Sequence, residues 1–136
     1  MHARLASVTG ERDLTAILAT LQSSLRAGTF VFVSVTDADD IPFAARIEEA
    51  EGITLVVDRS VADARQLAYD FVAHWITLDV HSSLQAVGLT AAVSSALTAA
   101  GISCNVLAGF YHDHLLVPAD RIDDALAVLD RLRTER

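Results

Sequence analysis

The sequence predicts an α+β sandwich in which two halves, residues 1–71 and 72–136, pack on one another. Three observations carry this prediction. Segments with helical spacing of apolar residues alternate with short β-branched runs, the connections are short, and hydrophobic residues make up 52% of the chain, which is ample for a core. No stretch rich in Pro, Gly or Ser separates the halves, so we expect no flexible linker between them.

The first half begins with a predicted helix over residues 13–26. Its apolar residues recur at intervals of three and four, and Gly28 follows as a stop signal. These apolar residues are Leu14, Ile17, Leu18, Leu21 and Leu25. Residues 30–35 are rich in β-branched and aromatic side chains and predict a strand, which ends in a turn at residues 37–40.

A hairpin and a short helix complete the first half. Residues 42–50 and 53–57 predict two strands joined at Glu51-Gly52, because such a pair between strand-forming runs is typical of a tight turn. Residues 60–69 predict a short helix, with Asp58 or Ser60 as its N-cap.

The second half opens with a strictly alternating strand at residues 74–80, so Trp75, Thr77 and Asp79 are expected on one face. A helix opened by Ser82 or Ser83 then runs to about residue 100, where Gly101 closes it. Strands at residues 103–108 and 114–117 and a helix at residues 120–132 follow. The order of parts repeats that of the first half, which indicates either a weak internal duplication or convergence on the same order of helix, glycine and strand.

Charge and cysteine content exclude several function classes. The formal net charge is -8, and all ten cations are arginines, several of them beside carboxylates, so we expect no nucleic-acid partner. Cys104 is the only cysteine and offers neither a disulfide within the chain nor a structural zinc site. Without a signal-like segment or a long apolar run, we expect a cytoplasmic protein with no membrane contact.

The segment from His81 to Gly88 is the clearest local signal, and it has two interpretations. Ser82 followed by Gln85 is a capping-box pattern, which requires no ligand. A helix N-terminus with Ser82 and Ser83 also suits a carboxylate or phosphate, because free backbone N–H groups and the helix dipole favour an anion. Gly88 favours the ligand, since a glycine so early in a helix indicates close approach of another group.

Tyr111-His112-Asp113-His114 suggests either metal binding or a hairpin turn. On a strand, His112 and His114 would share one face and could hold a metal, but no carboxylate has a spacing that completes the ligand set. Alternatively, the histidines donate hydrogen bonds that fix the hairpin or polarise a pocket, which makes His112 a candidate ligand contact. We expect no metal and no cofactor. Motifs of nucleophilic catalysis and phosphate binding are absent, so no enzymatic activity is expected.

The runs VHSSLQAVGLTAAVSSAL, GISCNVLAG and YHDH resemble a bacterial family of small ACT-domain proteins of undefined function. In that family a divergent N-terminal half precedes an ACT module. LQSSLRAGTFVFVSV and EAEGITLVV fit the N-terminal half more loosely, and the resemblance covers nearly the whole chain.

The resemblance implies a ferredoxin-like βαββαβ sandwich, often paired side by side, that binds amino acids or other small metabolites. The implied ligand contacts lie in the loop between strand and helix and on a facing strand. They are His81, Ser82, Ser83, Gly88, Leu89 and Asn105. The chain departs from the pattern because no strand follows the helix at residues 120–132. The missing edge strand comes from the N-terminal half, comes from another subunit, or does not exist.

We therefore expect a non-catalytic regulatory protein that binds a small molecule, with an amino acid as the expected ligand, and forms a homodimer. One alternative is a structural or protein-interaction domain that oligomerises without a ligand. The other is a metal-dependent enzyme that uses His112 and His114.

Overall fold

The computed structural model describes residues 14–79 and 88–134. Within them, seven strands form one sheet in the order β3-β4-β2-β5-β7-β6, and β1 pairs with β5. The strands are β1 Gln22–Leu25, β2 Phe30–Val35, β3 Ala45–Glu48, β4 Ile53–Asp58, β5 Val72–Asp79, β6 Asn105–Ala108 and β7 Asp113–Pro118. The helices are α2 Arg59–Ala64, α3 Leu89–Ala99 and α4 Ile122–Thr134, with a 3₁₀ turn, η1 Ala119–Arg121, before α4. Residues 14–19 are also helical.

β5 is the strand that joins the two halves. Along one side it pairs antiparallel with β7. Along the other side it pairs first with β2, where Ala73 lies opposite Phe30, and then with β1, where Ile76 lies opposite Leu25. β1, which comes from the N-terminal half, therefore takes the edge position beside β5 that is expected for a strand after α4.

The predicted helix over residues 13–26 is wrong in its second part. Helical residues end at 19, and Gln22–Leu25 instead forms β1. Leu21 is buried at 2% exposure, whereas Leu25 is 46% exposed and does not continue the apolar helix face. The two serines between them have modest helix propensity, and pairing with β5 satisfies the backbone groups of this segment in a ladder.

The predicted helix from Ser82 or Ser83 to residue 100 is not continuous. Gly88 has a φ of 96°, in the left-handed region, and is the N-cap of α3, which begins at Leu89. A right-handed helix cannot pass through this conformation. Val80 and the two serines lie outside the described residues.

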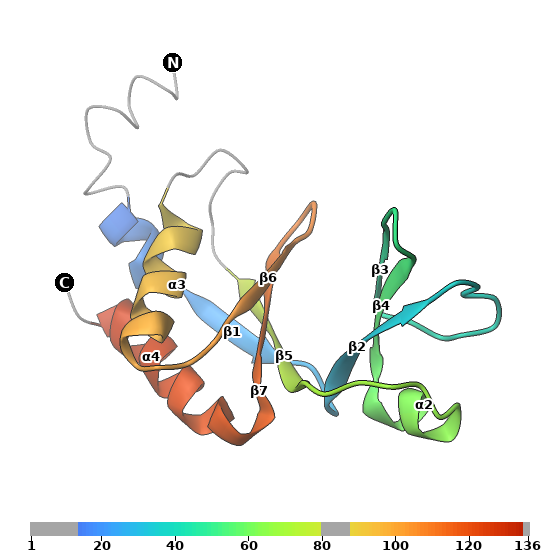
Figure 1. Ribbon diagram of the computed structural model, residues 1–136. Helices are drawn as coiled ribbons and strands as arrows, with labels where there is room; N and C mark the ends of the chain where they lie inside the picture. The colour runs from blue at the N-terminus through green and yellow to red at the C-terminus, as the bar shows by residue number, and fades with distance from the viewer. Residues whose placement is uncertain (1–13, 80–87, 135–136) are drawn as a thin grey trace, which may run out of the picture.

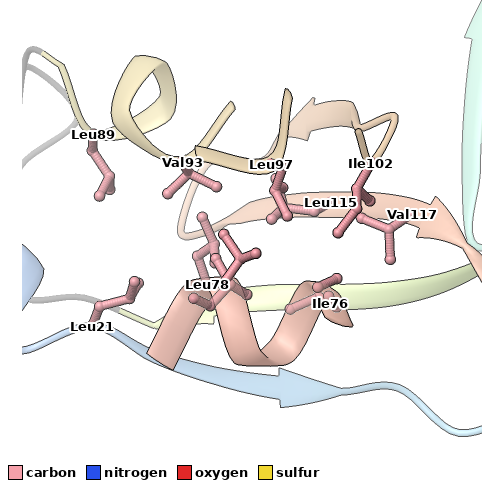
Figure 2. Close-up of a cluster of buried hydrophobic side chains, with 12 residues drawn as sticks. Leu21, Ile76, Leu78, Leu89, Val93, Leu97, Ile102, Leu115 and Val117 are labelled. Atoms are coloured by element: carbon pink, nitrogen blue, oxygen red, sulfur yellow. The ribbon is translucent and has the colours of Figure 1, made fainter. Parts of the chain in front are cut away.

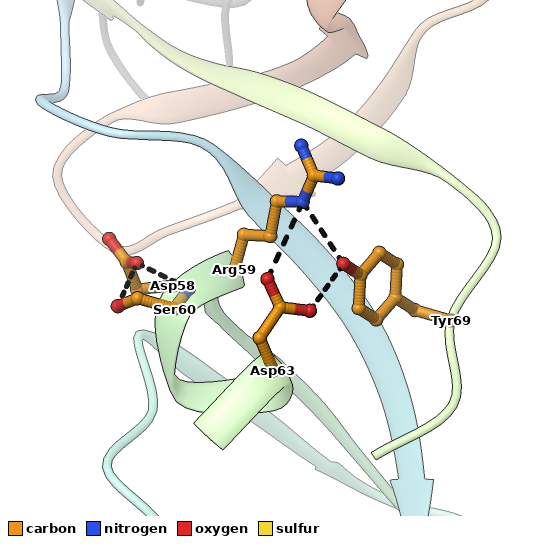
Figure 3. Close-up of polar contacts among 5 residues, drawn as sticks. All are labelled: Asp58, Arg59, Ser60, Asp63 and Tyr69. Atoms are coloured by element: carbon orange, nitrogen blue, oxygen red, sulfur yellow. Dashed lines mark hydrogen bonds and ion pairs between the residues drawn. The ribbon is translucent and has the colours of Figure 1, made fainter. Parts of the chain in front are cut away.

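The short helix of the first half begins as predicted and ends earlier. Asp58 is the N-cap of α2, and its carboxylate accepts hydrogen bonds from the backbone N–H and the hydroxyl of Ser60 (Figure 3). These bonds lower the pKa of Asp58. Residues 65–69 are not helical, because Gln66 adopts a φ of 57°. Beyond the helix, Tyr69 donates to Asp63 and accepts from Arg59.

The helices cover one face of the sheet. Alternation along β5 turns Ile76 and Leu78 toward α3 and α4, as the sequence predicts. Figure 2 shows Leu89, Val93 and Leu97 of α3 pointing toward the strands. At the other end of the sheet, α2 packs against β2 and β4 around Ala62 (Figure 1). None of the helices in the described ranges is long and apolar enough to cross a membrane.

The opposite face of the sheet has a core of its own. It consists of Phe30, Val56, Ala73, Trp75 and Leu116, and each is at most 5% exposed. All five residues belong to strands, so side chains from both halves of the sheet bury one another, and no helix of the described residues contributes to the cluster. We call these five residues the open-face cluster.

Candidate functional site

The two flanks of the loop between β5 and α3 contact the same turn. Before the loop, the carboxylate of Asp79 lies 3.6 Å from Nε2 of His112. After the loop, the hydroxyl of Thr90 donates to the carboxylate of Asp113 at 3.2 Å. His112 and Asp113 are neighbours at the β6–β7 turn, so residues on both flanks of the loop that the sequence predicts to bind a ligand contact this turn.

Among the described residues, no side chain caps the first backbone N–H groups of α3. Gly88, the N-cap residue, carries no side chain that could accept from them. A Cβ at Gly88 would lie 3.5 Å from Leu14, which is an ordinary contact. The left-handed φ therefore explains this glycine, and close approach of another group, as predicted, is not needed.

The sequence-predicted site residues divide into three groups. His81, Ser82 and Ser83 lie outside the described residues. Gly88 and His112 lie near the two flanks of the loop, whereas Leu89 is buried at 4% exposure in the core below α3. Asn105 is exposed on β6 opposite Leu116, so it lies on the sheet face turned away from α3. The structure thus does not bring Asn105 together with the start of α3.

His112 and His114 lie next to each other, and His114 also contacts two residues of β5. The ring centroids of His112 and His114 lie 6.4 Å apart. Nδ1 of His114 accepts a hydrogen bond from Nε1 of Trp75 at 3.1 Å and lies 3.0 Å from the hydroxyl of Thr77. No group of three His, Cys, Asp or Glu residues that could hold a metal occurs in residues 14–79 and 88–134. His114 instead links β7 to β5.

Burial lowers the pKa of His114, and the positive charge of Arg26 and the neighbouring His112 lower it further, against the opposing effect of Asp113. The hydrogen bond from Trp75 acts in the same direction, because an indole N–H can only donate. Nδ1 must therefore stay unprotonated to accept it. The neutral ring carries its hydrogen on Nε2.

Arg26 belongs to this neighbourhood, although the sequence analysis assigned it only to the end of a helix. It directly follows β1, and its backbone N–H donates to the carbonyl of Trp75 at 2.9 Å. Its guanidinium carbon lies 4.3 Å from the centroid of the Trp75 ring and 5.9 Å from that of Phe30. The contact depends on pairing between distant strands, so no local pattern in the sequence signals it.

An open groove between β1 and α4 offers less chemistry. It is lined by Leu21, Gln22, Ser23, Leu126, Leu129, Asp130 and Arg133. Arg133 and Asp130 pair at 2.6 Å within it, so their charges compensate one another. The remaining lining is apolar or neutral and gives a charged ligand no anchor.

The fold and the two similar halves define a protein with two ACT modules. Two family models, each described as an ACT domain, match residues 9–74 and 71–131. The chain belongs to the ACT-domain family. The predicted family and the ferredoxin-like fold are thereby confirmed. No curated protein has a matching sequence.

Solved structures agree with this assignment. A Vibrio cholerae protein of unknown function, described as a possible transport protein, is 37% identical with a TM-score of 0.85, and the match covers 91% of this chain and 98% of that one. An Agrobacterium tumefaciens protein is 17% identical with a TM-score of 0.66, over 83% and 89% of the two chains. The regulatory subunit of aspartate kinase from Thermus flavus is 9% identical with a TM-score of 0.57, over 83% and 96%. The last two show similarity of fold.

Proposed function

We propose that this protein is a non-catalytic regulatory module that binds a free amino acid at the loop between β5 and α3. The observation that carries the proposal is that Asp79 and Thr90, on either side of this loop, both contact the β6–β7 turn. A ligand held by the loop would therefore also touch His112. The ligand residues from the loop itself are His81, Ser82 and Ser83, with Gly88 and the backbone of Leu89 at the helix start.

The charges around the loop favour a zwitterion over a simple anion. The uncapped N-terminus of α3 attracts a carboxylate, and serine hydroxyls can donate to it. Asp79 and Asp113 at the same end of the sheet would repel a phosphate but attract an ammonium group. An α-amino acid carries both charges a few bonds apart. Asn105 lies on the other face and would contribute only through a second molecule.

Regulatory proteins with this fold support the role, as the Thermus flavus subunit illustrates. We further propose that the protein is a cytoplasmic homodimer. Within each chain, the two halves meet between residues 71 and 72. The sheet ends in β3 and β6, whose outer edges pair with no described strand and could meet the same edge of a second copy.

A protein-interaction domain without a ligand is the second candidate. Phe110 and Tyr111 at the tip of the β6–β7 turn are 74% and 83% exposed, and their rings pack edge to face 4.9 Å apart. Exposed aromatic pairs of this kind often mark contacts with another protein.

To test the proposal, the melting temperature (Tm) of the purified protein is measured in the presence of each standard amino acid. At 100 times its dissociation constant, a ligand adds about 2.7 kcal/mol of stability, which raises Tm by several degrees. We expect a single amino acid, or a set of chemically similar amino acids, to raise the Tm of the wild type. Ser83→Ala and His112→Ala should weaken the shift, and Ser95→Ala, on the exposed face of α3, should retain it.

Other outcomes would contradict the proposal. No Tm shift with any amino acid, together with dimers in solution, would favour the protein-interaction domain. A shift produced by a divalent metal and lost in His112→Ala and His114→Ala would favour the metal-dependent alternative.

A further inference from the structure

The face of the sheet opposite the helices is apolar and only partly closed. The open-face cluster is surrounded by partly buried hydrophobic residues: Phe32, Ala45, Phe71 and Leu107. The rings of Phe32 and Phe71 stack with centroids 6.3 Å apart. No described helix contributes to this surface, and Figure 1 shows the β3–β4 and β6–β7 hairpins projecting on either side of it.

Arg26 places a positive charge on this face. Among the described residues no carboxylate lies within 4 Å of it, whereas Arg46, Arg59, Arg121 and Arg133 each pair with an acidic side chain. Arg65 and Arg131 also lack an ion pair among the described residues, so what distinguishes Arg26 is its position against the Trp75 ring. The Trp75 ring holds the guanidinium 4.3 Å from its centroid, which reduces the freedom of the side chain and leaves its N–H groups for another partner.

His114 adds a donor next to the same indole. Its ring centroid lies 5.3 Å from that of Trp75, and the hydrogen bond accepted at Nδ1 leaves the ring hydrogen on Nε2. Gly109 lies on that side, where a Cβ would come within 3.1 Å of Nε2. The glycine thus keeps a side chain away from this nitrogen.

We propose that Arg26 and His114, arranged around Trp75, bind the carboxylate of a small molecule whose apolar body packs on Leu107, which lies opposite His114 on the same face of the sheet. The guanidinium can donate two parallel hydrogen bonds to the carboxylate, which is the strongest common geometry for this pair. An apolar floor with a few polar groups at one end is typical of small-molecule sites. This site lies on the face turned away from α3, and the His114 ring lies 6.4 Å from that of His112, which belongs to the proposed amino-acid site.

Trp75 reports on the site directly, because it is the only tryptophan in the chain. Its fluorescence is recorded while phenylacetate or 4-methylpentanoate is added to the full-length protein. Phenethylamine, which has an aromatic body but no carboxylate, and sodium chloride at equal ionic strength are the controls. We expect a saturable change with both carboxylates and none with either control.

Variants identify the groups responsible. Arg26→Gln should weaken binding of phenylacetate at least tenfold, and Arg26→Lys should weaken it less, because the charge remains without the planar fork. Arg131→Gln, an exposed arginine of α4, is the matched control and should bind as the wild type does. Circular dichroism establishes that each variant is folded.

Several results would overturn the proposal. They are the absence of a saturable change with millimolar carboxylates, an equal response to phenethylamine, or unchanged affinity in folded Arg26→Gln or Arg26→Lys. An amino acid that raises Tm in a Ser83-dependent way, without any carboxylate changing Trp75 fluorescence, would support the loop site and overturn this one. If Arg26→Gln does not fold, the wild type still tests the proposal, because an equal fluorescence response to phenylacetate and phenethylamine would overturn it.

Discussion

At the scale of single residues, Trp75 organises the face opposite the helices. Its ring packs on Phe30 with centroids 5.5 Å apart, carries Arg26 on its π-face, and donates a hydrogen bond to His114. These contacts connect β1, β2, β5 and β7. A buried indole needs a partner for its N–H, and His114 provides one from the neighbouring strand.

The lowered pKa of His114 predicts a stability that falls in mild acid. Because the folded protein holds His114 below the ordinary histidine pKa, the unfolded chain takes up a proton first as pH decreases. The contribution of His114 is fully present above the unfolded pKa of about 6.5 and decreases as pH falls from there through the folded pKa.

Urea unfolding at pH 7.5 and 5.5 checks this expectation. The wild type should lose more stability over this interval than His114→Gln, which keeps a neutral acceptor for Trp75 and cannot titrate. Equal losses in the two proteins would contradict the assigned direction. His114 is partly exposed, so the difference should be modest.

At the scale of elements, the junction between β4 and α2 depends on one close approach. Asp58 caps α2, while the backbone N–H of Arg59 donates to the carbonyl of Thr29 at 2.9 Å. Gly28, with a φ of 84°, lies so close that a Cβ would be 2.8 Å from the Asp58 carboxylate. Local patterns predict the cap, but only the pairing of β2 with β4 brings Gly28 to it.

Gly28→Ala should therefore destabilise the protein more than Gly101→Ala. Both glycines have a left-handed φ, and alanine there costs about 1–2 kcal/mol in strain. A Cβ at Gly101 meets no atom within 4 Å, whereas one at Gly28 forces the Asp58 carboxylate to move, and loss of its cap on α2 costs about 1 kcal/mol more. Chemical denaturation of both variants measures the difference, and equal losses would show that the Asp58 contact does not matter.

At the scale of the whole molecule, β5 joins the two halves in one sheet. It pairs with strands of both halves, and the open-face cluster contains residues of both. Such shared burial couples the unfolding of one half to the other, because separating them would expose Val56 and Leu116 together.

We therefore expect Leu55→Ala and Leu115→Ala to lower the same unfolding transition. Both leucines are fully buried, Leu55 below α2 and Leu115 below α3, and each substitution should cost about 2–5 kcal/mol. Leu25→Ala, 46% exposed, is the control and should change stability little. Trp75 fluorescence and far-UV circular dichroism should give coincident curves. A Leu55→Ala variant with an unchanged Trp75 transition would contradict the coupling.

The sequence by itself determined the family, the fold class and most strands, because these follow from local chemistry. The alternation that turns Trp75 and Thr77 away from Ile76 and Leu78, the tight turn at Glu51-Gly52, and the Asp58 cap all depend on near neighbours in the chain. For the loop residues His81, Ser82 and Ser83, the assignment as a ligand site remains a prediction.

Only the tertiary structure decided which elements complete the sheet and where its polar groups meet. The spacing of Leu14 to Leu25 suits a helix, but pairing with β5 turns its end into β1 and carries Arg26 onto Trp75. Likewise, the strand register rather than local spacing separates Asn105 from α3 and joins His114 to Thr77. The physical reason is that ladder hydrogen bonds and shared burial are formed between residues far apart in sequence, and they outweigh local propensities of a few tenths of a kcal/mol per residue.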